Sequence, residues 1–149
     1  MGGYVDANGA QRGYLRDSQG ITLVDVPGAL STTALDISPL GDIVGVFVRS
    51  DGKSRGFFLS KGSFTAFEVP GATFTEADSI SPRGDIVGGY TDGAGRTHGF
   101  VLRSGYLITL DFPGSNYTFP AYINSLGQIV GAYRDATGRF HGFLATPEY

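Results

Sequence analysis

The 149-residue chain contains no cysteine and no tryptophan, and charged side chains make up only 17% of it. Without cysteine it forms no disulfides and offers no thiolate metal ligands. Its eleven lysines and arginines are scattered singly, and the formal net charge is −3. Binding to nucleic acid or to an anionic membrane needs a concentrated basic surface. The sequence therefore predicts neither kind of partner.

Long apolar segments and helical patterns are missing as well. No apolar run approaches the roughly 18 residues of a membrane-spanning helix. Residues 1–20 lack the apolar centre of a signal peptide. No segment places apolar residues at helical spacing between capping residues. We therefore expect an all-β chain that carries no export signal of its own.

Glycine, by contrast, is abundant, and much of it recurs at a fixed interval. The chain has 24 glycines, more than twice the average share. An interval of 43 residues, without insertion or deletion, relates the members of several series: Gly13, Gly56, Gly99 and Gly142; Gly2, Gly45, Gly88 and Gly131; Pro27, Pro70 and Pro113; Ile37, Ile80 and Ile123. We expect Gly45 and its counterparts to let a neighbouring backbone or an aromatic ring approach closely.

Each repeat contains four short segments with strand character. In the middle copy they are residues 76–81, 85–90, 97–102 and 106–112, each bounded by Gly, Pro, Asp or Ser. Four short antiparallel strands in about 43 residues are typical of a β-propeller blade. A β-solenoid is the competing architecture, but its coils are usually shorter and lack tight Asp-Gly hairpins. The fold class predicted is therefore all-β, with β-propeller blades of four antiparallel strands.

The chain holds about 3.5 repeats in a single repeat domain, residues 1–149. The predicted boundaries are a partial blade at 2–27, full repeats at 28–70 and 71–113, and a partial blade at 114–149. Closed propellers have about four to eight blades. Either the chain closes alone as a small four-bladed ring, or two copies complete a ring of about seven or eight blades. We favour the second arrangement, a homodimer, because open ends would leave apolar faces and strand edges bare.

One recurring string resembles a known repeat family. Asp-Ile-Val-Gly-Gly-Tyr at 85–90, Arg-Thr-His-Gly-Phe at 96–100 and Asp-Phe-Pro-Gly at 111–114 resemble the HAF-type bacterial extracellular repeats. The His-Ala-Phe-like core reads His98-Gly99-Phe100 and His141-Gly142-Phe143, with Arg-Gly-Tyr at 12–14 and Arg-Gly-Phe at 55–57 as departures. The resemblance implies an extracellular or cell-surface setting.

The residue types that carry chemistry repeat in ways that favour structural roles. The two histidines share one repeat position with Arg12 and Arg55, which indicates hydrogen bonding or stacking rather than metal binding. The acidic residues Asp25, Glu68 and Asp111 precede the repeated prolines and are expected to cap a blade. The Asp-Gly turns lack the alternating ligands of a calcium loop. The sequence thus predicts no catalytic residue, no metal site and no cofactor.

Positions on or near the first strand of each repeat vary in chemistry while the framework repeats. The ligand-binding candidates there are Asp36, Asp78, Ser79, Tyr122 and Asn124. We expect a non-enzymatic scaffold or binding module, with a glycan or peptide as ligand. The alternatives are an enzyme at the channel mouth, such as a lyase or glycosidase, and a fragment or engineered repeat with no function of its own.

Overall fold

A computed structural model describes residues 1–147 of the chain. It contains fourteen β-strands and no helix among those residues, which confirms the all-β prediction. The strands are β1 (Gly2–Val5), β2 (Gln11–Asp17), β3 (Gly20–Val24), β4 (Ser31–Ile37), β5 (Ile43–Val48), β6 (Ser54–Ser60), β7 (Ser63–Phe67), β8 (Phe74–Ile80), β9 (Ile86–Thr91), β10 (Thr97–Arg103), β11 (Tyr106–Leu110), β12 (Thr118–Ile123), β13 (Ile129–Arg134) and β14 (Phe140–Ala145).

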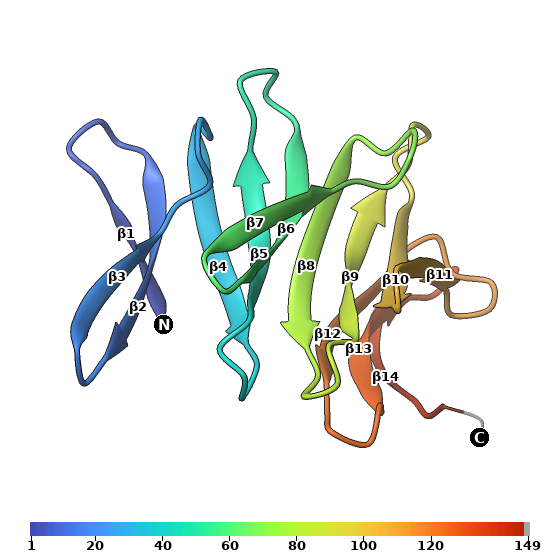
Figure 1. The fold of residues 1–149 in the computed structure, drawn as a ribbon. Coiled ribbons are helices and arrows are strands. Elements are labelled where there is room, and N and C mark those ends of the chain that lie inside the picture. Colours follow the sequence, from blue (N-terminus) through green and yellow to red (C-terminus); the bar gives the residue numbers. More distant parts are fainter. Residues whose placement is uncertain (148–149) are drawn as a thin grey trace.

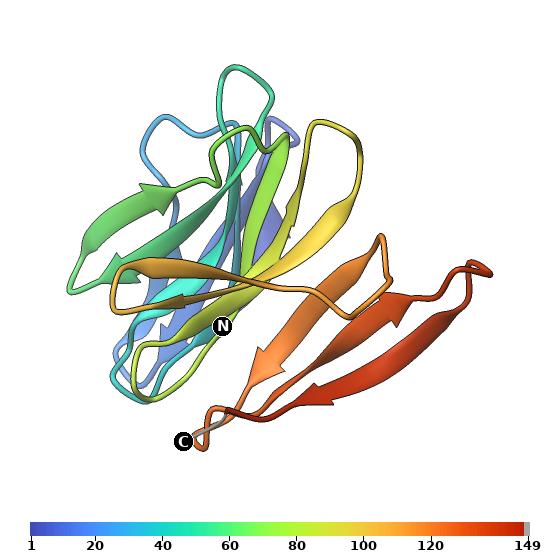
Figure 2. The same ribbon diagram turned by 90° about the vertical axis from the view of Figure 1, so that its right-hand side faces the viewer.

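Consecutive strands pair antiparallel and fall into four groups. Group 1 is β1–β3, group 2 is β4–β7, group 3 is β8–β11 and group 4 is β12–β14. Groups 2 and 3 belong to one eight-stranded sheet because a single parallel pair, Ser54 with Phe74, links β6 to β8. Figure 1 shows the groups following one another along the molecule, with groups 1 and 4 at opposite ends, and the turned view in Figure 2 shows group 4 as a sheet of its own beside the others. No sheet closes on itself within the described residues.

The apolar core lies at the joints between successive groups. One cluster joins Val24 of β3 to Ile43 and Phe57 of group 2, and the next joins Val44 of β5 to Phe100 and other residues of group 3. Neighbouring side chains on a strand point to opposite faces of the sheet. Ile43 therefore packs on the preceding group and Val44 on the following one. Each group buries apolar side chains of its neighbours, so the stability of the array depends on the interfaces between successive groups.

The repeated glycine of the second strand in a group lies very close to a backbone carbonyl oxygen of the neighbouring first strand. A Cβ atom built on Gly45 would lie 2.0 Å from the carbonyl oxygen of Thr33 and 2.8 Å from the ring of Phe57. A Cβ on Gly88 would lie 2.0 Å from the carbonyl oxygen of Glu76. The expected close approach of a backbone and an aromatic ring is confirmed, and no larger residue fits there.

A β-bulge interrupts the first strand of groups 2, 3 and 4 at the same place. Pairing skips one residue between Ala34 and Asp36 in β4, and likewise between Ala77 and Ser79 in β8 and between Pro120 and Tyr122 in β12. The extra residues are therefore Leu35, Asp78 and Ala121. A bulge redirects the side chains that follow it, and it positions the candidate residues described next.

Candidate functional site

Two of the predicted ligand-binding residues contact each other across groups 2 and 3. The hydroxyl of Ser79 donates a 2.7 Å hydrogen bond to Asp36 Oδ2, which also accepts the backbone N–H of Ile80 at 3.0 Å. The Ser79 hydroxyl in turn accepts the backbone N–H of Ile123 in group 4 at 3.3 Å. These polar side chains therefore connect the first strands of three successive groups, and their hydrogen bonds are used within the fold.

Two other predicted residues have different surroundings. Tyr122 follows the bulge of β12, and its side chain is exposed. Asn124 lies beyond the end of that strand, where its Oδ1 accepts the N–H groups of Leu126 and Gln128 at 2.9 and 3.0 Å. Ser38 and Ser81 hold the same position and accept turn N–H groups in the same way. Asn124 therefore orders its own turn, whereas Tyr122 remains available to a ligand.

The fifth predicted residue, Asp78, is the bulge residue of β8 and carries the most perturbed carboxyl group. Its Oδ2 atom is buried and has no hydrogen-bond partner among the described residues. Burial raises the pKa of Asp78 to about 9, and the neighbouring Glu76 carboxylate contributes to the increase. Asp78 is therefore a neutral acid at pH 7, because burial disfavours its charged form and a second negative charge beside Glu76 adds to that effect.

The histidine position forms a bridge between two carboxylates. In group 3, His98 Nδ1 lies 2.7 Å from Asp111 Oδ2 and His98 Nε2 lies 3.3 Å from Asp92 Oδ2. The hydrogen bond with Asp111 raises the pKa of His98, partial burial opposes the increase, and the bond with Asp92 adds to it. The Tyr90 ring stacks on the imidazole at a centroid distance of 4.9 Å. The expected hydrogen bonding and stacking are confirmed for His98.

Arginine replaces histidine in the equivalent bridges of groups 1 and 2. Arg12 pairs with Asp6 at 3.0 Å and with Asp25 at 2.9 Å. Arg55 pairs with Asp51 at 3.3 Å, and its Nε lies 2.5 Å from a Glu68 oxygen, although the N–H direction does not meet hydrogen-bond geometry. In group 4, His141 pairs with Asp135 at 2.7 Å. The arginine or histidine at this repeat position thus contacts the turn in all four groups and the acidic residue after the fourth strand in groups 1 to 3, which is a structural role.

The Asp residues of the turns between second and third strands bind backbone N–H groups. Asp92 Oδ1 accepts the N–H groups of Ala94 and Arg96 at 2.8 and 2.9 Å. Asp135 Oδ1 does the same with Thr137 and Arg139. Such oxygens are already occupied by turn hydrogen bonds. In residues 1–147 no group of three or more His, Asp or Glu side chains is arranged to hold a metal ion.

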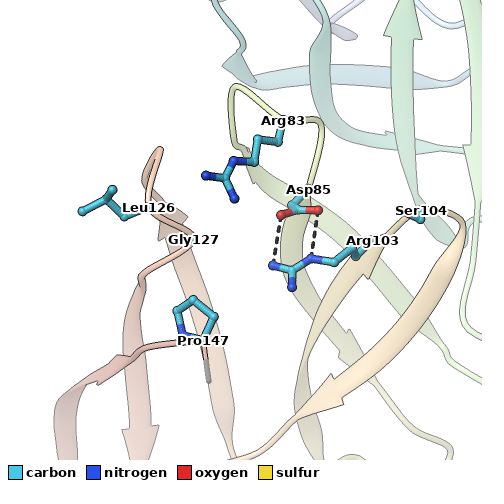
Figure 3. A pocket seen from close by; sticks show the side chains of 7 residues that line it. All are labelled: Arg83, Asp85, Arg103, Ser104, Leu126, Gly127 and Pro147. Atoms are coloured by element: carbon cyan, nitrogen blue, oxygen red, sulfur yellow. Dashed lines mark hydrogen bonds and ion pairs between the residues drawn. The ribbon is translucent and has the colours of Figure 1, made fainter. Parts of the chain in front are cut away.

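A pocket between groups 3 and 4 was not predicted. Its volume is about 300 Å³, and turns of both groups and the segment after β14 line it. Figure 3 shows a bidentate contact between the Arg103 guanidinium and the Asp85 carboxylate. The Nε–Oδ1 and Nη2–Oδ2 distances are 3.0 Å each. Asp85 is buried, so it fixes the guanidinium of Arg103 at the pocket. The Arg83 side chain extends toward Leu126 and Gly127 (Figure 3).

The two arginines give this pocket a local excess of positive charge in an otherwise acidic chain. Arg83 forms no ion pair with any residue in 1–147, and Arg103 shares its charge with one carboxylate. A planar guanidinium binds carboxylate groups through paired hydrogen bonds. The pocket can therefore bind an anionic group, but its lining within residues 1–147 contains no nucleophile paired with a base. The sequence signal was present, since Leu40 and Leu126 take the place of Arg83 in the other groups.

No family model matches the chain, and no curated protein matches it. The structure has no helix long and apolar enough to cross a membrane within residues 1–147. Functional inference consequently depends on the geometry of the strand groups, their end surfaces and the pocket.

Proposed function

We propose that this chain is a non-enzymatic scaffold or binding module of the β-propeller type, completed by association with a second copy. The proposal depends mainly on one observation. Apolar side chains at the two ends of the array are exposed, whereas the residues at the same repeat positions inside the array are buried. The proposed blades correspond to the four strand groups. Their support is the antiparallel order within groups 2 and 3 and the 43-residue offset between equivalent bonded residues such as Asp36 and Ser79.

The first of these surfaces is the outer face of group 4, which we call the tail face (Val130 and Leu144). Val130 is 45% exposed and Leu144 is 63% exposed. Val44 and Val87, which hold the position of Val130 in groups 2 and 3, are fully buried by the next group. Burying each tail-face side chain against a partner contributes about 1 to 2 kcal/mol. The tail face therefore has the composition of an internal joint that lacks its neighbour.

The second surface is the outer face of group 1, which we call the head face (Tyr4, Tyr14 and Ile21). Tyr4 and Ile21 are exposed, and Tyr14 is half-buried. Phe57 and Phe100, the counterparts of Tyr14, are fully buried in the core clusters. The head face of one copy thus resembles the surface on which the tail of another copy would pack. Such head-to-tail contacts join unlike surfaces and end either in a closed ring or in a filament.

A ring is the outcome that we propose, because it leaves no apolar end exposed. Two chains together hold eight strand groups, or about seven 43-residue repeats, which lies within the range of about four to eight blades that closed propellers use. We expect a single dimer of about twice the 15.7 kDa chain mass by light scattering after size exclusion and by native mass spectrometry. A chain that stays monomeric at all concentrations would contradict the assembly.

A matched pair of variants assigns the contact to the tail face. Leu144→Asp places a charge on the tail face and is expected to yield monomers that remain folded. Leu40→Asp introduces the same charge on an exposed turn residue and is expected to leave the dimer intact. If Leu144→Asp still dimerises as tightly as the original chain, the tail face is not the interface.

For the binding half of the function, we propose that the pocket of Arg83 and Arg103 takes an acidic group of a glycan or peptide. The supporting observation is that Arg83 forms no ion pair within residues 1–147 and lies at the same pocket as Arg103, whose guanidinium is held by Asp85. Trigalacturonate and tri-glutamate are suitable probes, titrated by calorimetry at low salt. Arg83→Ala should reduce binding at least tenfold, whereas Arg49→Ala, on a distant turn, should not. Equal binding by both variants would exclude the pocket.

A channel-mouth enzyme, such as a lyase or glycosidase, is the second candidate, and one observation favours it. Asp78 keeps a proton at neutral pH beside Glu76, and a carboxyl group with a raised pKa is the usual general acid in glycoside cleavage. A panel of polysaccharides would be screened for release of reducing ends. Turnover that is abolished in Asp78→Asn would support an enzyme, and turnover unaffected by that change would remove this acid from the reaction.

An extracellular or cell-surface setting and kinship with HAF-type repeats are also proposed. Their support is the recurring core of each third strand, an arginine or histidine followed by glycine and an aromatic residue, whose first side chain lies against at least one carboxylate in every group. Cell fractionation followed by antibody detection tests the setting. Detection only inside the cytoplasm would contradict it.

A further inference from the structure

A second pocket lies at the joint between groups 2 and 3, next to the pocket of Arg83 and Arg103. Its volume is about 460 Å³. Its apolar walls come from both groups and consist of Phe58, Phe67, Ile86 and Leu102. We call it the phenylalanine pocket, and we call the pocket of Arg83 and Arg103 the arginine pocket. Groups 2 and 3 each contain all four strands, so the phenylalanine pocket is built between two complete repeats.

The apolar walls of the phenylalanine pocket are the edge of a core cluster. Phe58, Phe67 and Leu102 are half-buried and pack against the cluster that contains Phe100. Ile86 belongs to the same cluster and is 4% exposed. A side chain that enters the pocket therefore contacts apolar atoms that the fold already holds in place, and the burial of its own apolar surface favours binding.

The two pockets adjoin, because Arg83, Asp85 and Ser104 line both of them. The Arg83 side chain extends toward Leu126 on the arginine-pocket side (Figure 3). Asp85 holds the Arg103 guanidinium at the same pocket through two 3.0 Å contacts. Two arginines thus lie beside an apolar pocket, and one short ligand can contact both pockets.

The residues of this joint depart from the types that the repeat places elsewhere. At the positions of Phe58 and Phe67 the other groups carry only aliphatic residues, namely Leu15, Val101, Leu144, Val24 and Leu110. The equivalent pocket between groups 3 and 4 is lined by aliphatic counterparts and has a volume of about 160 Å³. Arg83 likewise replaces the leucine of the other groups. These departures meet at one place, which is expected of a ligand-binding position rather than of the framework.

We propose that the two pockets together bind a peptide segment that carries an apolar side chain close to a carboxylate. The apolar side chain enters the phenylalanine pocket, and the carboxylate binds Arg83 at the arginine pocket through paired hydrogen bonds. This inference rests on the proposed binding function and deepens it by choosing the peptide among its ligand classes. Charge complementarity with the arginines selects the carboxylate, and the apolar walls select its neighbour.

The walls of the phenylalanine pocket favour a peptide over an acidic glycan. Each sugar ring carries hydroxyl groups, which would lose hydrogen bonds to water against Ile86 and Leu102. A leucine side chain loses none on entering. In an extended peptide, side chains two residues apart lie on one face at a spacing of about 7 Å. A leucine two residues before a glutamate therefore brings one group to each of the adjoining pockets.

A short blocked peptide, acetyl-Gly-Leu-Thr-Glu-Gly-amide, tests the inference. It would be titrated at low salt into the isotope-labelled full chain and followed by NMR. Two matched peptides each remove one feature, with serine replacing leucine or glutamine replacing glutamate. We expect the leucine–glutamate peptide to bind at least tenfold more tightly than either, because each change removes one of the two contacts. Equal binding by the leucine and serine peptides would overturn the inference, as would amide shifts outside residues 65–67 and 83–86.

A matched pair of variants assigns the leucine to the phenylalanine pocket. Thr65 is exposed and lines this pocket, so Thr65→Trp fills it with an aromatic side chain. Thr22 holds the same repeat position in group 1 and is also exposed, which makes Thr22→Trp the control. We expect Thr65→Trp to lose the tenfold advantage of leucine over serine and to keep its binding of tri-glutamate. Thr22→Trp should keep both, and an equal leucine advantage in the two variants would contradict the assignment.

The proposed function and this inference fail in different ways. Tri-glutamate binding that depends on Arg83, with no added affinity from leucine, would overturn this inference and leave the proposed function standing. Trigalacturonate that binds as tightly as the leucine–glutamate peptide would overturn the choice of a peptide. A leucine advantage that persists in Arg83→Ala, with equal binding of the glutamine peptide, would overturn the carboxylate contact on which both depend.

Discussion

Replacing Asp78 with asparagine isolates the energetic effect of its half-buried carboxyl group. In the folded chain the pKa of Asp78 is raised to about 9, whereas an unperturbed aspartate titrates at 3.8. Because the folded pKa is the higher one, the folded state binds the proton more tightly than the unfolded state. The stabilisation from this proton is complete below pH 3.8 and is lost progressively as the pH rises toward 9.

The magnitude follows from the width of that range. One pKa unit corresponds to about 1.4 kcal/mol, so the loss between pH 3.8 and pH 7 is at most about 4 kcal/mol. Water and local relaxation reduce such effects for groups that are not fully enclosed. We therefore expect Asp78→Asn to be more stable than the original chain by about 2 kcal/mol at pH 7 and about equal to it near pH 4.

Urea unfolding at pH 4, 5.5 and 7, followed by circular dichroism, measures this difference. Contributions from the other carboxylates cancel when the two chains are compared at each pH. Glu76→Gln is the control, and it should retain most of the pH dependence because burial is the larger cause of the raised pKa. A difference between Asp78→Asn and the original chain that does not change with pH would refute the reasoning.

Two further predictions concern the framework. The raised pKa of His98 means that its contribution is complete below pH 6.5 and is lost as the pH rises through the folded value. The difference in stability between His98→Asn and the original chain should therefore change by about 1 kcal/mol or less between pH 6 and pH 9, in favour of the variant as the pH rises. Urea unfolding of both chains at each pH measures this difference, and a difference that does not change with pH would contradict it. Gly45→Ala brings a Cβ within 2.0 Å of a backbone oxygen and should destabilise the chain by about 3 kcal/mol. Gly142→Ala meets no atom closer than 3.9 Å and should change stability by about 0.5 kcal/mol or less in a thermal melt; equal effects of the two alanines would refute the close contact.

Much of the local structure could be predicted from residues that act through short-range chemistry. The expected segment 97–102 matches β10, and 106–112 contains β11. Turn glycines such as Gly52 and Gly95 adopt φ values of 77° and 79°, as a tight hairpin after Asp requires. Gly45 could be identified as a close-approach position because a glycine within an apolar strand seldom has another cause.

The remaining features depend on the placement of segments relative to one another. The bulge of β8 is invisible in the sequence, because an extra residue alters pairing without altering composition. The alternation of side chains therefore did not indicate that Asp78 would be half-buried while Ser79 turned toward Asp36. The pocket of Arg83 and Arg103 forms only because turns of group 3 lie beside group 4 in the folded chain. No local sequence pattern predicts that arrangement.

The repeated bulge has a consequence for how such a chain can change over time. The extra residue does not take part in strand pairing, so its identity is decoupled from the pairing on either side. Leucine, aspartate and alanine occupy it at positions 35, 78 and 121, while apolar residues close each strand at Ile37, Ile80 and Ile123. The bulge therefore gives each of groups 2, 3 and 4 one position that can be substituted without a change in the strand pairing around it.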